Sequence, residues 1–582
     1  MTSVQPRLPR AALAGRGSIV GIVTALVALG VAQLVAAALA SPTGAPVDAV
    51  GALSIDHTPA AVKNFAISTF GSSDKTVLVW GIRVVLLVFA VVIGILAVRR
   101  LWLGMVGLAV FTAIGVYAAL VRPTATATDA LPSLVGGAVA AIALRYFCGL
   151  ARRGLTGAAP PDRARHRAGA ASPVDWTPTP DKTPADAASA RPADAAGTRP
   201  ADAAGARPSG DQQREPAWTG ADPGPDRRRF LVSSLAVAAG SLVAYGGGSW
   251  LASSRDVGAA AQALRLPRPV SPAPPLPPGA DLGIPGLSSF VTPNGSFYRV
   301  DTALVLPEVL PSQWQLRIHG LVRKDLVLSF ADLLKRPLIE DYVTLCCVSN
   351  PVGGPYIGNA KWLGASLRSL LQEAGVQAGA SQLLCTSSDG FTSGTPVETA
   401  MDGRDALLAV GMNGTPLPVA HGFPARLVIP GLYGYVSACK WIVDIEVTTY
   451  AAAQAYWVPR GWAPQGPVKT ESRIDVPTGQ NAVRTGQTVS VAGVAWAQHK
   501  GIDAVEVRVG GGPWQQARLA AVPGIDTWRQ WVYDWNVNVG PGSYLLEARA
   551  TDKTGYTQTS LAAPPEPNGA SGYPSVLVNV TQ

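Results

Sequence analysis

Four long apolar stretches near the N-terminus constrain this chain more than any other feature. Each is close to the ~20 apolar residues that a helix needs to cross a bilayer, and together they occupy residues 17–40, 77–98, 101–120 and 131–150. Arginines stand before the first stretch, between the second and third, and after the fourth, and the positive-inside rule places all of them in the cytoplasm. The arginines are Arg7, Arg10, Arg16, Arg99, Arg100, Arg152 and Arg153. The sequence therefore predicts a four-helix transmembrane module over residues 1–153.

Length and composition indicate several further units outside this module. A chain of 582 residues exceeds the usual size of one core. Only 15% of its residues are charged, below the ~25% typical of soluble domains. The net charge of +9 comes from arginines beside the apolar stretches and in a low-complexity segment, so we expect no nucleic-acid partner. The five cysteines lack paired CxxC spacing, which indicates neither a zinc site nor a dense disulfide framework.

The middle of the chain predicts a linker, an export segment and a spacer. Residues 154–225 are rich in Ala, Pro, Asp and Arg and are predicted to form a disordered cytoplasmic linker. Residues 226–252 resemble a twin-arginine export signal, with Arg227, Arg228, Phe230 and Leu231 at the motif positions. The alternative is an ordinary fifth membrane helix, and without a clear cleavage site we favour a retained anchor. Residues 253–289 are predicted to be a stiff Pro-rich spacer.

The rest of the chain has the pattern of two globular domains outside the cytoplasm. Residues 290–469 alternate β-like runs, such as 314–320 and 342–345, with helical ones such as 366–374, which indicates a mixed α/β domain. Beyond residue 470 only strand patterns remain, at 488–496, 504–509, 528–535 and 543–550. Their spacing predicts a β-sandwich over residues 470–582.

Cys347 is the residue that most needs an explanation. It lies in Thr344-Leu-Cys-Cys-Val-Ser-Asn350, where a β-like run gives way to a loop. An exported free thiol there is a buried packing residue, a disulfide partner or a metal ligand. Spacing alone favours packing.

The motifs downstream of Cys347 change that balance. In order they are Gly358-Asn-Ala-Lys-Trp362, Asp389-Gly-Phe391, Met412-Asn-Gly-Thr-Pro-Leu-Pro-Val-Ala-His421-Gly-Phe-Pro-Ala-Arg426-Leu-Val-Ile-Pro430-Gly-Leu-Tyr433-Gly-Tyr, and Ala438-Cys-Lys440-Trp441. This succession resembles the molybdopterin-binding domain of sulfite oxidases and related membrane-anchored bacterial enzymes. The C-terminal strands resemble that family's immunoglobulin-like domain. The resemblance covers residues 290–582.

The resemblance implies a molybdenum-molybdopterin cofactor and the residues that hold it. Cys347, in the Cys-x-x-Asn position, is the implied thiolate ligand of molybdenum, whereas the family does not use the position of Cys346. A soft thiolate suits such a metal, and a buried phosphate needs cationic donors. The other implied site residues are His421, Arg426 and Lys440 on the pterin's phosphate and polar edges, Asn294, Phe297 and Tyr298 on the other side, and Phe391 in the substrate pocket. Taken alone, His421 has the alternative role of a hydrogen-bonded structural histidine. Arg426 has the alternative role of a core-edge salt bridge, but the site is favoured for it because phosphate recognition favours Arg.

Two departures from the animal and plant enzymes leave the substrate open. Pro351-Val-Gly-Gly354 stands where those enzymes have Arg, and Phe391 stands where they have a pocket Tyr; Arg299 or Arg404 would have to compensate. Losing two charge-assisted donors, each worth roughly 1.5–3 kcal/mol, weakens an anion pocket greatly. We therefore hold three hypotheses: oxidation of sulfite or a related small oxyanion, reduction of an S-oxide or N-oxide such as oxidised methionine in proteins, and a non-catalytic membrane scaffold.

Electron transfer is expected to need a separate protein. The histidines are His57, His166, His319, His421 and His499, none of them inside the four apolar stretches, so no haem is expected there. The predicted partner is a soluble cytochrome or a membrane redox protein. We also expect a multi-pass location in the inner or plasma membrane, a catalytic domain on the extracytoplasmic side, and possible homodimers through the β-sandwich.

Overall fold

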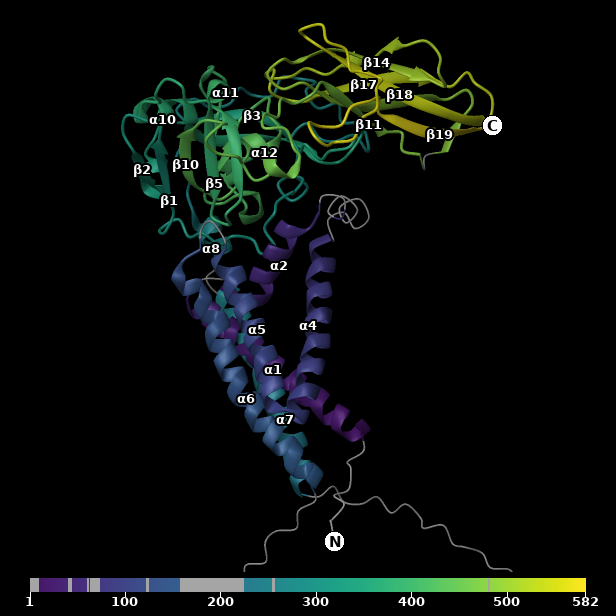
Figure 1. Cartoon of the computed structure of the whole chain (residues 1–582). Helices are drawn as coiled ribbons and strands as arrows, with labels where there is room; N and C mark the ends of the chain where they lie inside the picture. The colour runs from purple at the N-terminus through teal and green to yellow at the C-terminus, as the bar shows by residue number, and fades with distance from the viewer. Residues whose placement is uncertain are drawn as a thin grey trace, which may run out of the picture.

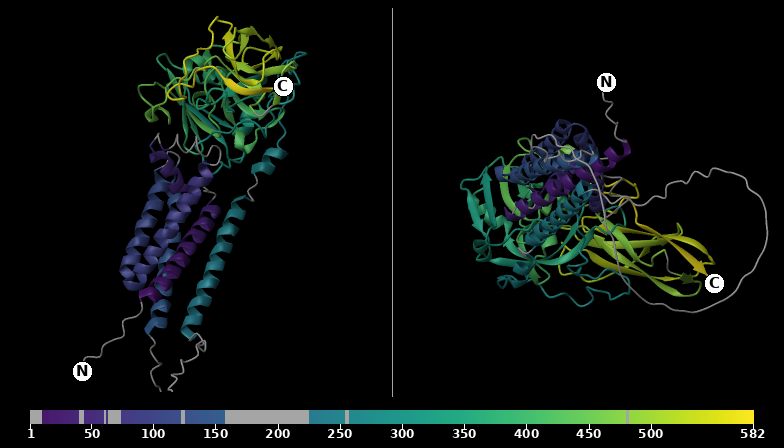
Figure 2. Two further views of the ribbon diagram at one scale, coloured as in Figure 1. Left: turned by 90° about the vertical axis from the view of Figure 1, so that its right-hand side faces the viewer. Right: turned by 90° about the horizontal axis from the view of Figure 1, so that it is seen from below.

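The computed structural model describes residues 10–39, 44–59, 62, 74–121, 125–156, 225–253, 257–479 and 482–582. A helical bundle stands beneath a mixed α/β domain, and a domain of strands lies beside the latter (Figures 1 and 2). Residues 157–224, which make up most of the predicted linker, lie outside the described residues.

Five helices of the bundle are long and apolar enough to cross a membrane, judged by length and composition within the described residues. Four of them coincide with the predicted apolar stretches. Glycines allow close approach of their backbones: a Cβ on Gly21 would collide with the carbonyl of Ala90, and one on Gly94 with that of Gly17. The helices of the bundle are α1 (Arg10–Ala38), α2 (Pro46–His57), α4 (Asp74–Arg99), α5 (Leu101–Leu120), η3 (Ala127–Ala130), α6 (Leu131–Thr156) and α7 (Pro225–Ser253).

Arginines from distant parts of the sequence meet at the end of the bundle opposite the mixed domain (Figure 1). Arg16 donates to the carbonyl of Ala151 over 3.0 Å, and the Nε of Arg152 donates to that of Val98 over 3.0 Å. Phe230, at the start of α7, is buried in the same region against α1, α4 and α6. The short helix α2, which the sequence analysis did not predict, lies at the other end, toward the mixed domain.

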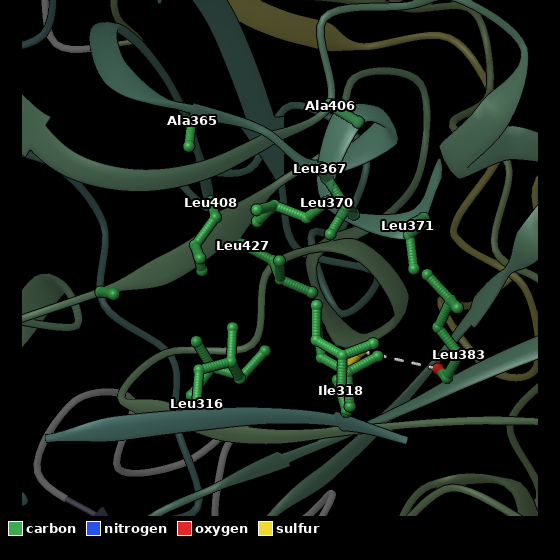
Figure 3. Packing of buried hydrophobic residues seen from close by; sticks show 14 of the residues in the cluster. Leu316, Ile318, Ala365, Leu367, Leu370, Leu371, Leu383, Ala406, Leu408 and Leu427 are labelled. Atoms are coloured by element: carbon green, nitrogen blue, oxygen red, sulfur yellow. Dashed lines mark hydrogen bonds between the residues drawn. The ribbon is translucent and has the colours of Figure 1, made fainter. Parts of the chain in front are cut away.

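The mixed domain contains two sheets. The first has the order β2-β1-β10-β5-β6; the second has the order β3-β4-β7-β8, and β9 pairs with β7. Its main hydrophobic core includes Leu316, Ile318, Leu408 and Leu427 (Figure 3). The strands are β1 (Gln315–Gly320), β2 (Leu326–Ser329), β3 (Leu338–Cys346), β4 (Ile357–Ser366), β5 (Gln382–Ser387), β6 (Thr392–Pro396), β7 (Leu407–Met412), β8 (Thr415–Pro416), β9 (Arg426–Val428) and β10 (Ile442–Thr448).

Short helices complete this domain, and α10 shows why they form. Ser366 caps its N-terminus by accepting from the backbone N–H of Ser369, its leucines face the core, and it ends at Gly375, whose φ is +74°. The helix predicted over residues 366–374 is thereby confirmed to within one residue. The helices are α8 (Val257–Ala263), α9 (Phe330–Leu334), α10 (Leu367–Ala374), α11 (Val397–Met401), η4 (Val419–His421), α12 (Gly434–Ser437) and η5 (Val458–Arg460).

The C-terminal domain consists of two sheets with the orders β11-β13-β17-β16 and β12-β19-β18-β14-β15. One hydrophobic core, which includes Val491, Val505, Trp531 and Leu546, contains residues of both sheets. The four predicted strand runs are confirmed with small shifts at their ends. The strands are β11 (Glu471–Val476), β12 (Ala482–Arg484), β13 (Thr488–Trp496), β14 (Ile502–Val509), β15 (Gln515–Gln516), β16 (Arg518–Leu519), β17 (Arg529–Asn536), β18 (Gly542–Asp552) and β19 (Ser575–Thr581).

Strand β3 is held from both domains. The N–H of Thr344 donates to the carbonyl of Asp526 over 2.9 Å, and its carbonyl accepts from Gln498 Nε2 over 2.9 Å. Its hydroxyl accepts from the N–H of Trp528 over 2.7 Å and donates to Asn359 Oδ1 over 3.0 Å. Because Thr344, Asn359, Gln498 and Trp528 are buried, hydrogen bonds join the interiors of the two domains.

The stretch predicted as a spacer differs from that expectation. Residues 257–263 form α8, and Val270 and Ser271 pair with β3 through Leu338 and Glu340. Asp281 accepts from the N–H of Phe290 over 2.9 Å. A proline has no backbone N–H, but the amides of its neighbours can still pair with an edge strand. Because Val270 and Ser271 pair with β3 in this way, the stretch lies along the mixed domain and does not act as a spacer between that domain and the bundle.

We predict that Thr344→Val destabilises the protein by about 2 kcal/mol or more, because it leaves a buried N–H and a buried amide oxygen unsatisfied. Urea unfolding of the detergent-solubilised chain, followed by tryptophan fluorescence, measures this. Thr488→Val is the matched control, since the hydroxyl of Thr488 donates to Asn536 at an exposed position, and we expect a change within about 0.5 kcal/mol. Equal losses in both variants would contradict the prediction.

Candidate functional site

Cys347 lies directly after β3 in a tight turn that presents its sulfur. Its N–H donates to the carbonyl of Tyr356 over 2.9 Å, and its carbonyl accepts from the N–H of Asn350 over 3.0 Å. Asn350 Oδ1 accepts from the N–H of Tyr356 over 2.8 Å, which closes the turn. The Cys347 Sγ lies 3.0 Å from the hydroxyl of Ser349. This hydroxyl is placed to donate to a thiolate.

The two adjacent cysteines differ in their surroundings. Cys346 is fully buried in a cluster with Phe290, Tyr433 and Trp528, whereas Cys347 is half-buried. Burial raises the pKa of both thiols. For Cys347, the Ser349 hydrogen bonds and the charge of Lys440 act in the opposite direction and lower the pKa. Of the two, only Cys347 has a sulfur that a ligand can reach.

Arg426 is a buried cation without a carboxylate. It is 5% exposed, its Nη1 donates to the carbonyl of His421 over 3.1 Å, and its guanidinium lies 5.0 Å from the ring of Trp362. Within the described residues it forms no ion pair, so the alternative of a core-edge salt bridge does not describe it. Burial lowers the pKa of Arg426 to about 10. A buried guanidinium whose hydrogen-bond partners are all carbonyl groups keeps its positive charge available to bind an anion.

His421 lies beside Arg426 and is neutral at physiological pH. Its Nε2 is 3.0 Å from the carbonyl oxygen of Asn294, which places a proton on that nitrogen. Burial first, then the charge of Arg426, lowers the pKa of His421 to about 4. Gly422 follows with a φ of +106°, and a Cβ there would meet Arg426 and Lys440 at 3.0–3.2 Å. This glycine therefore lets the three polar side chains converge.

The segment from Asn294 to Tyr298 forms the facing wall. The rings of Phe297 and Tyr298 stack at 5.3 Å, and Phe297 packs edge-on against His421 at 5.6 Å. Burial raises the pKa of Tyr298, the nearby thiols of Cys347 and Cys346 raise it further, and the charge of Arg426 lowers it. Asn294 is held by Asn413, whose Nδ2 donates to its Oδ1 over 2.8 Å.

Lys440 completes this group through a residue that the sequence analysis missed. Its Nζ lies 2.9 Å from Asp301 Oδ2, and Arg299 Nε binds the same oxygen at 3.0 Å. Asp301 is almost fully buried. No motif signalled Asp301, because its partner is 139 residues away in sequence. Of the two arginines considered as compensating residues, for which the sequence favours a surface or structural role, Arg299 is at the site. Arg404 binds Asp402 and the carbonyl of Pro430 as a structural residue.

Phe391 lies on a separate, adjoining wall. It stacks at a tilt on Tyr456 at 5.6 Å and lines a cavity of about 200 Å³. The backbone N–H of Ser388, three residues earlier, donates to the carbonyl of Trp441, which follows Lys440. The cavity is bounded by the mixed domain and by the helical bundle, through Asp48, Ala52, Leu53, Ile55, Ala118, Val121, Thr302, Ala303, Leu304, Val305, Asp389, Gly390, Phe391, Tyr456 and Arg460. The structure therefore gathers seven of the predicted residues into one group and places Phe391 beside it.

The mixed domain is similar in sequence to known proteins. Residues 303–457 match the family model described as the oxidoreductase molybdopterin binding domain. The chain is 32% identical to sulfite oxidase of Gallus gallus over 47% of its own length and 69% of the chicken protein, and 29% identical to the mitochondrial sulfite oxidase of Rattus norvegicus over 47% and 58%. It is also 32% identical to the uncharacterized oxidoreductase YuiH of Bacillus subtilis (strain 168), over 27% of this chain and 75% of that one.

The chain is a molybdopterin-dependent oxidoreductase and belongs to the sulfite oxidase family. It spans little more than half the length of its mammalian relative. Membership in a family of enzymes removes the third hypothesis, a non-catalytic scaffold.

The residues present fit the cofactor that this family implies. Among the residues that the structure describes, no group of three or more His, Cys, Asp or Glu side chains is placed to hold a metal ion. A metal at Cys347 must therefore bring its other ligands with it, as a pterin dithiolene does. The buried guanidinium of Arg426 is a suitable partner for the phosphate of such a cofactor.

We predict that His421 makes the cofactor-free protein less stable in acid. Its folded-state pKa of about 4 lies below the ordinary 6.5, so the unfolded chain binds a proton first as the pH falls. The stability from the neutral imidazole is complete above about pH 6.5 and is lost toward pH 4, by about 2 kcal/mol at pH 5. Urea unfolding of wild-type protein and of His421→Gln at pH 7.5 and pH 5 checks this. Between the two pH values, the free energy of unfolding should fall by about 2 kcal/mol less in the variant than in the wild type. Parallel losses would show that His421 titrates normally.

Proposed function

We propose that this protein is a membrane-anchored molybdenum enzyme that transfers an oxygen atom and two electrons to or from a small substrate, most similar in chemistry to sulfite oxidase. The observation that supports this most directly is the buried guanidinium of Arg426, whose hydrogen-bond partners are all carbonyl groups, in the same domain as the half-buried sulfur of Cys347. A thiol that a ligand can reach and a buried cation suit a ligand that carries a soft metal and a phosphate.

Each site residue has a role in this proposal. The cofactor, when bound, supplies the two-electron oxygen-atom chemistry. Cys347 is the thiolate ligand, and the hydroxyl of Ser349 stabilises its negative charge. Arg426 and Lys440 bind the phosphate and polar edges, and Asp301 orients Lys440. His421 stays neutral, and its N–H donates a hydrogen bond to the carbonyl of Asn294. It therefore fixes the position of the facing wall and adds no charge to the site.

For the substrate we propose sulfite or a related small oxyanion, bound in the cavity beside Phe391. That cavity contains Thr302 and Arg460 among its polar groups. Reduction of an S-oxide or N-oxide is the second candidate, and a specific observation favours it. The same cavity has an apolar side of Leu53, Ile55 and Leu304 next to the uncharged ring of Phe391, which suits a neutral sulfoxide better than an anion.

We also propose the following arrangement of the chain. Residues 1–153 form a transmembrane module, 154–225 a cytoplasmic linker, 226–252 a fifth, retained membrane helix and 290–469 the catalytic domain outside the cytoplasm. The burial of Phe230 among α1, α4 and α6 supports retention of α7, and the arginines at the far end of the bundle support the orientation. Residues 470–582 form an immunoglobulin-like domain that mediates dimerisation, and a separate carrier exchanges electrons with the enzyme.

We predict one molybdenum per chain in protein matured in a host that makes the cofactor. X-ray absorption should show one fewer sulfur ligand in Cys347→Ser, because an alkoxide oxygen replaces the thiolate, and turnover should fall by at least ~100-fold. Cys346→Ala is the matched control and should keep the full sulfur shell, since Cys346 points into a hydrophobic cluster. Wild-type protein without molybdenum would refute the proposed function.

The direction of the reaction is tested by anaerobic absorption spectra of the wild-type enzyme. We expect sulfite to reduce the oxidised enzyme, because the metal-bound site accepts two electrons from a substrate that gains one oxygen atom. If only a sulfoxide reacts, by reoxidising the reduced enzyme, the second candidate replaces the first. Heat-denatured enzyme with the same substrates serves as the control.

A further inference from the structure

The helix α2 separates two cavities. Asp48, Ala52 and Leu53 on it line the cavity of the catalytic domain described above. Pro46 and Val50, each two residues from Asp48 and so roughly 200° away around the same helix, line a second cavity of about 150 Å³ inside the helical bundle. An α-helix with its side chains is about 10 Å wide, so the two cavities are that close.

The second cavity is enclosed by four of the long helices and is almost wholly apolar. Small residues create its space, among them Ala28 of α1 and Gly136 of α6, while Phe89 of α4 and Phe111 of α5 supply aromatic walls. Two of its lining residues, Phe89 and Ile114, are 47% and 41% exposed on the outside of the bundle. The wall of the cavity therefore includes residues of the outer, lipid-facing surface of the bundle.

One polar group in the cavity lacks a partner. The side-chain oxygen of Ser133, at the start of α6, is buried and makes no hydrogen bond, and the residue is 4% exposed. Thr24 and Thr112 also line the cavity, but their hydroxyls donate to backbone carbonyls of their own helices. A buried hydroxyl without a partner costs about 1–3 kcal/mol, and a bound acceptor would recover that energy.

We propose that this cavity binds a quinone, with the Ser133 hydroxyl donating to a quinone carbonyl, and that the quinone is the enzyme's electron carrier. This inference rests on the proposed function. A quinone ring is apolar and flat, carries carbonyl acceptors, and dissolves in lipid, as the lining requires. The alternative occupant, a lipid acyl chain, has no acceptor for Ser133.

The electron count of a quinone matches the chemistry of the catalytic domain. When a substrate gains one oxygen atom from water, two electrons and two protons are released, and these convert one quinone to one quinol. In the opposite direction, one quinol supplies the two electrons and two protons that remove an oxygen atom from an S-oxide as water. Both candidate reactions are therefore balanced with a single carrier.

Direct binding tests the proposal on the full chain in lipid nanodiscs. Calorimetric titration with decylubiquinone and with menadione should show saturable binding of at least one of them. Ser133→Ala should weaken it about 3- to 10-fold, the effect of one lost hydrogen bond. Ser234→Ala is the matched control, because Ser234 is also 4% exposed with an unpartnered hydroxyl but lies on α7 outside the cavity.

Filling the cavity is the second test. Ala28→Phe should weaken binding at least ~10-fold, whereas Ala113→Phe, at an exposed position of α5 outside the cavity lining, should leave it unchanged. Absence of saturable binding, equal effects of Ser133→Ala and Ser234→Ala, or a phospholipid in the cavity by native mass spectrometry that quinone does not displace would each overturn the proposal.

The test separates this proposal from the proposed function. Cys347→Ser protein, which lacks the thiolate ligand, should bind quinone as tightly as wild type because Cys347 lies in the other domain. Molybdenum in wild-type protein without quinone binding would refute the electron carrier and leave the enzyme intact. If wild-type protein binds quinone but contains no molybdenum, the proposed function is refuted and the quinone site stands.

Discussion

Strand β3 is the element on which the site depends, and Thr344 is where it is fixed. Three residues before Cys347, the backbone and hydroxyl of Thr344 are bound to Asp526, Gln498 and Trp528 of the C-terminal domain. Since these bonds are buried, loosening any of them leaves a polar group unsatisfied. The C-terminal domain thus determines where β3 ends, and with it the position of the sulfur that follows.

The opposite side of the site obeys a different constraint, which is electrostatic. Arg426 is buried with carbonyl partners alone, and burying a cation without a counter-charge is costly. Lys440 and Arg299 share the carboxylate of Asp301, and among the described residues no carboxylate forms an ion pair with Arg426. The protein therefore carries an excess of positive charge in its interior, which an anionic cofactor would offset.

The sequence predicted the elements whose signal is local. Apolar runs of spanning length predicted the long helices, and alternating runs predicted the strands of both domains. The candidate site residues came from the resemblance, and seven of them lie together in the structure. The sequence missed α2, because twelve residues of mixed polarity show neither a spanning length nor a strong period. It also missed Asp301 and the pairing of Val270 and Ser271 with β3, since such contacts join residues far apart in the chain.

Those missed elements are the ones that connect the parts of the molecule. An anchor need only be long and apolar, but α2 also contributes Asp48 and Leu53 to a cavity whose other wall is Phe391. A bundle that merely tethered the enzyme would have no reason to shape that cavity. One face of α2 borders that cavity, and the opposite face borders the apolar cavity in the bundle. This helix therefore packs where the bundle meets the mixed domain, and it is this contact that gives our quinone proposal a short path between the two cavities.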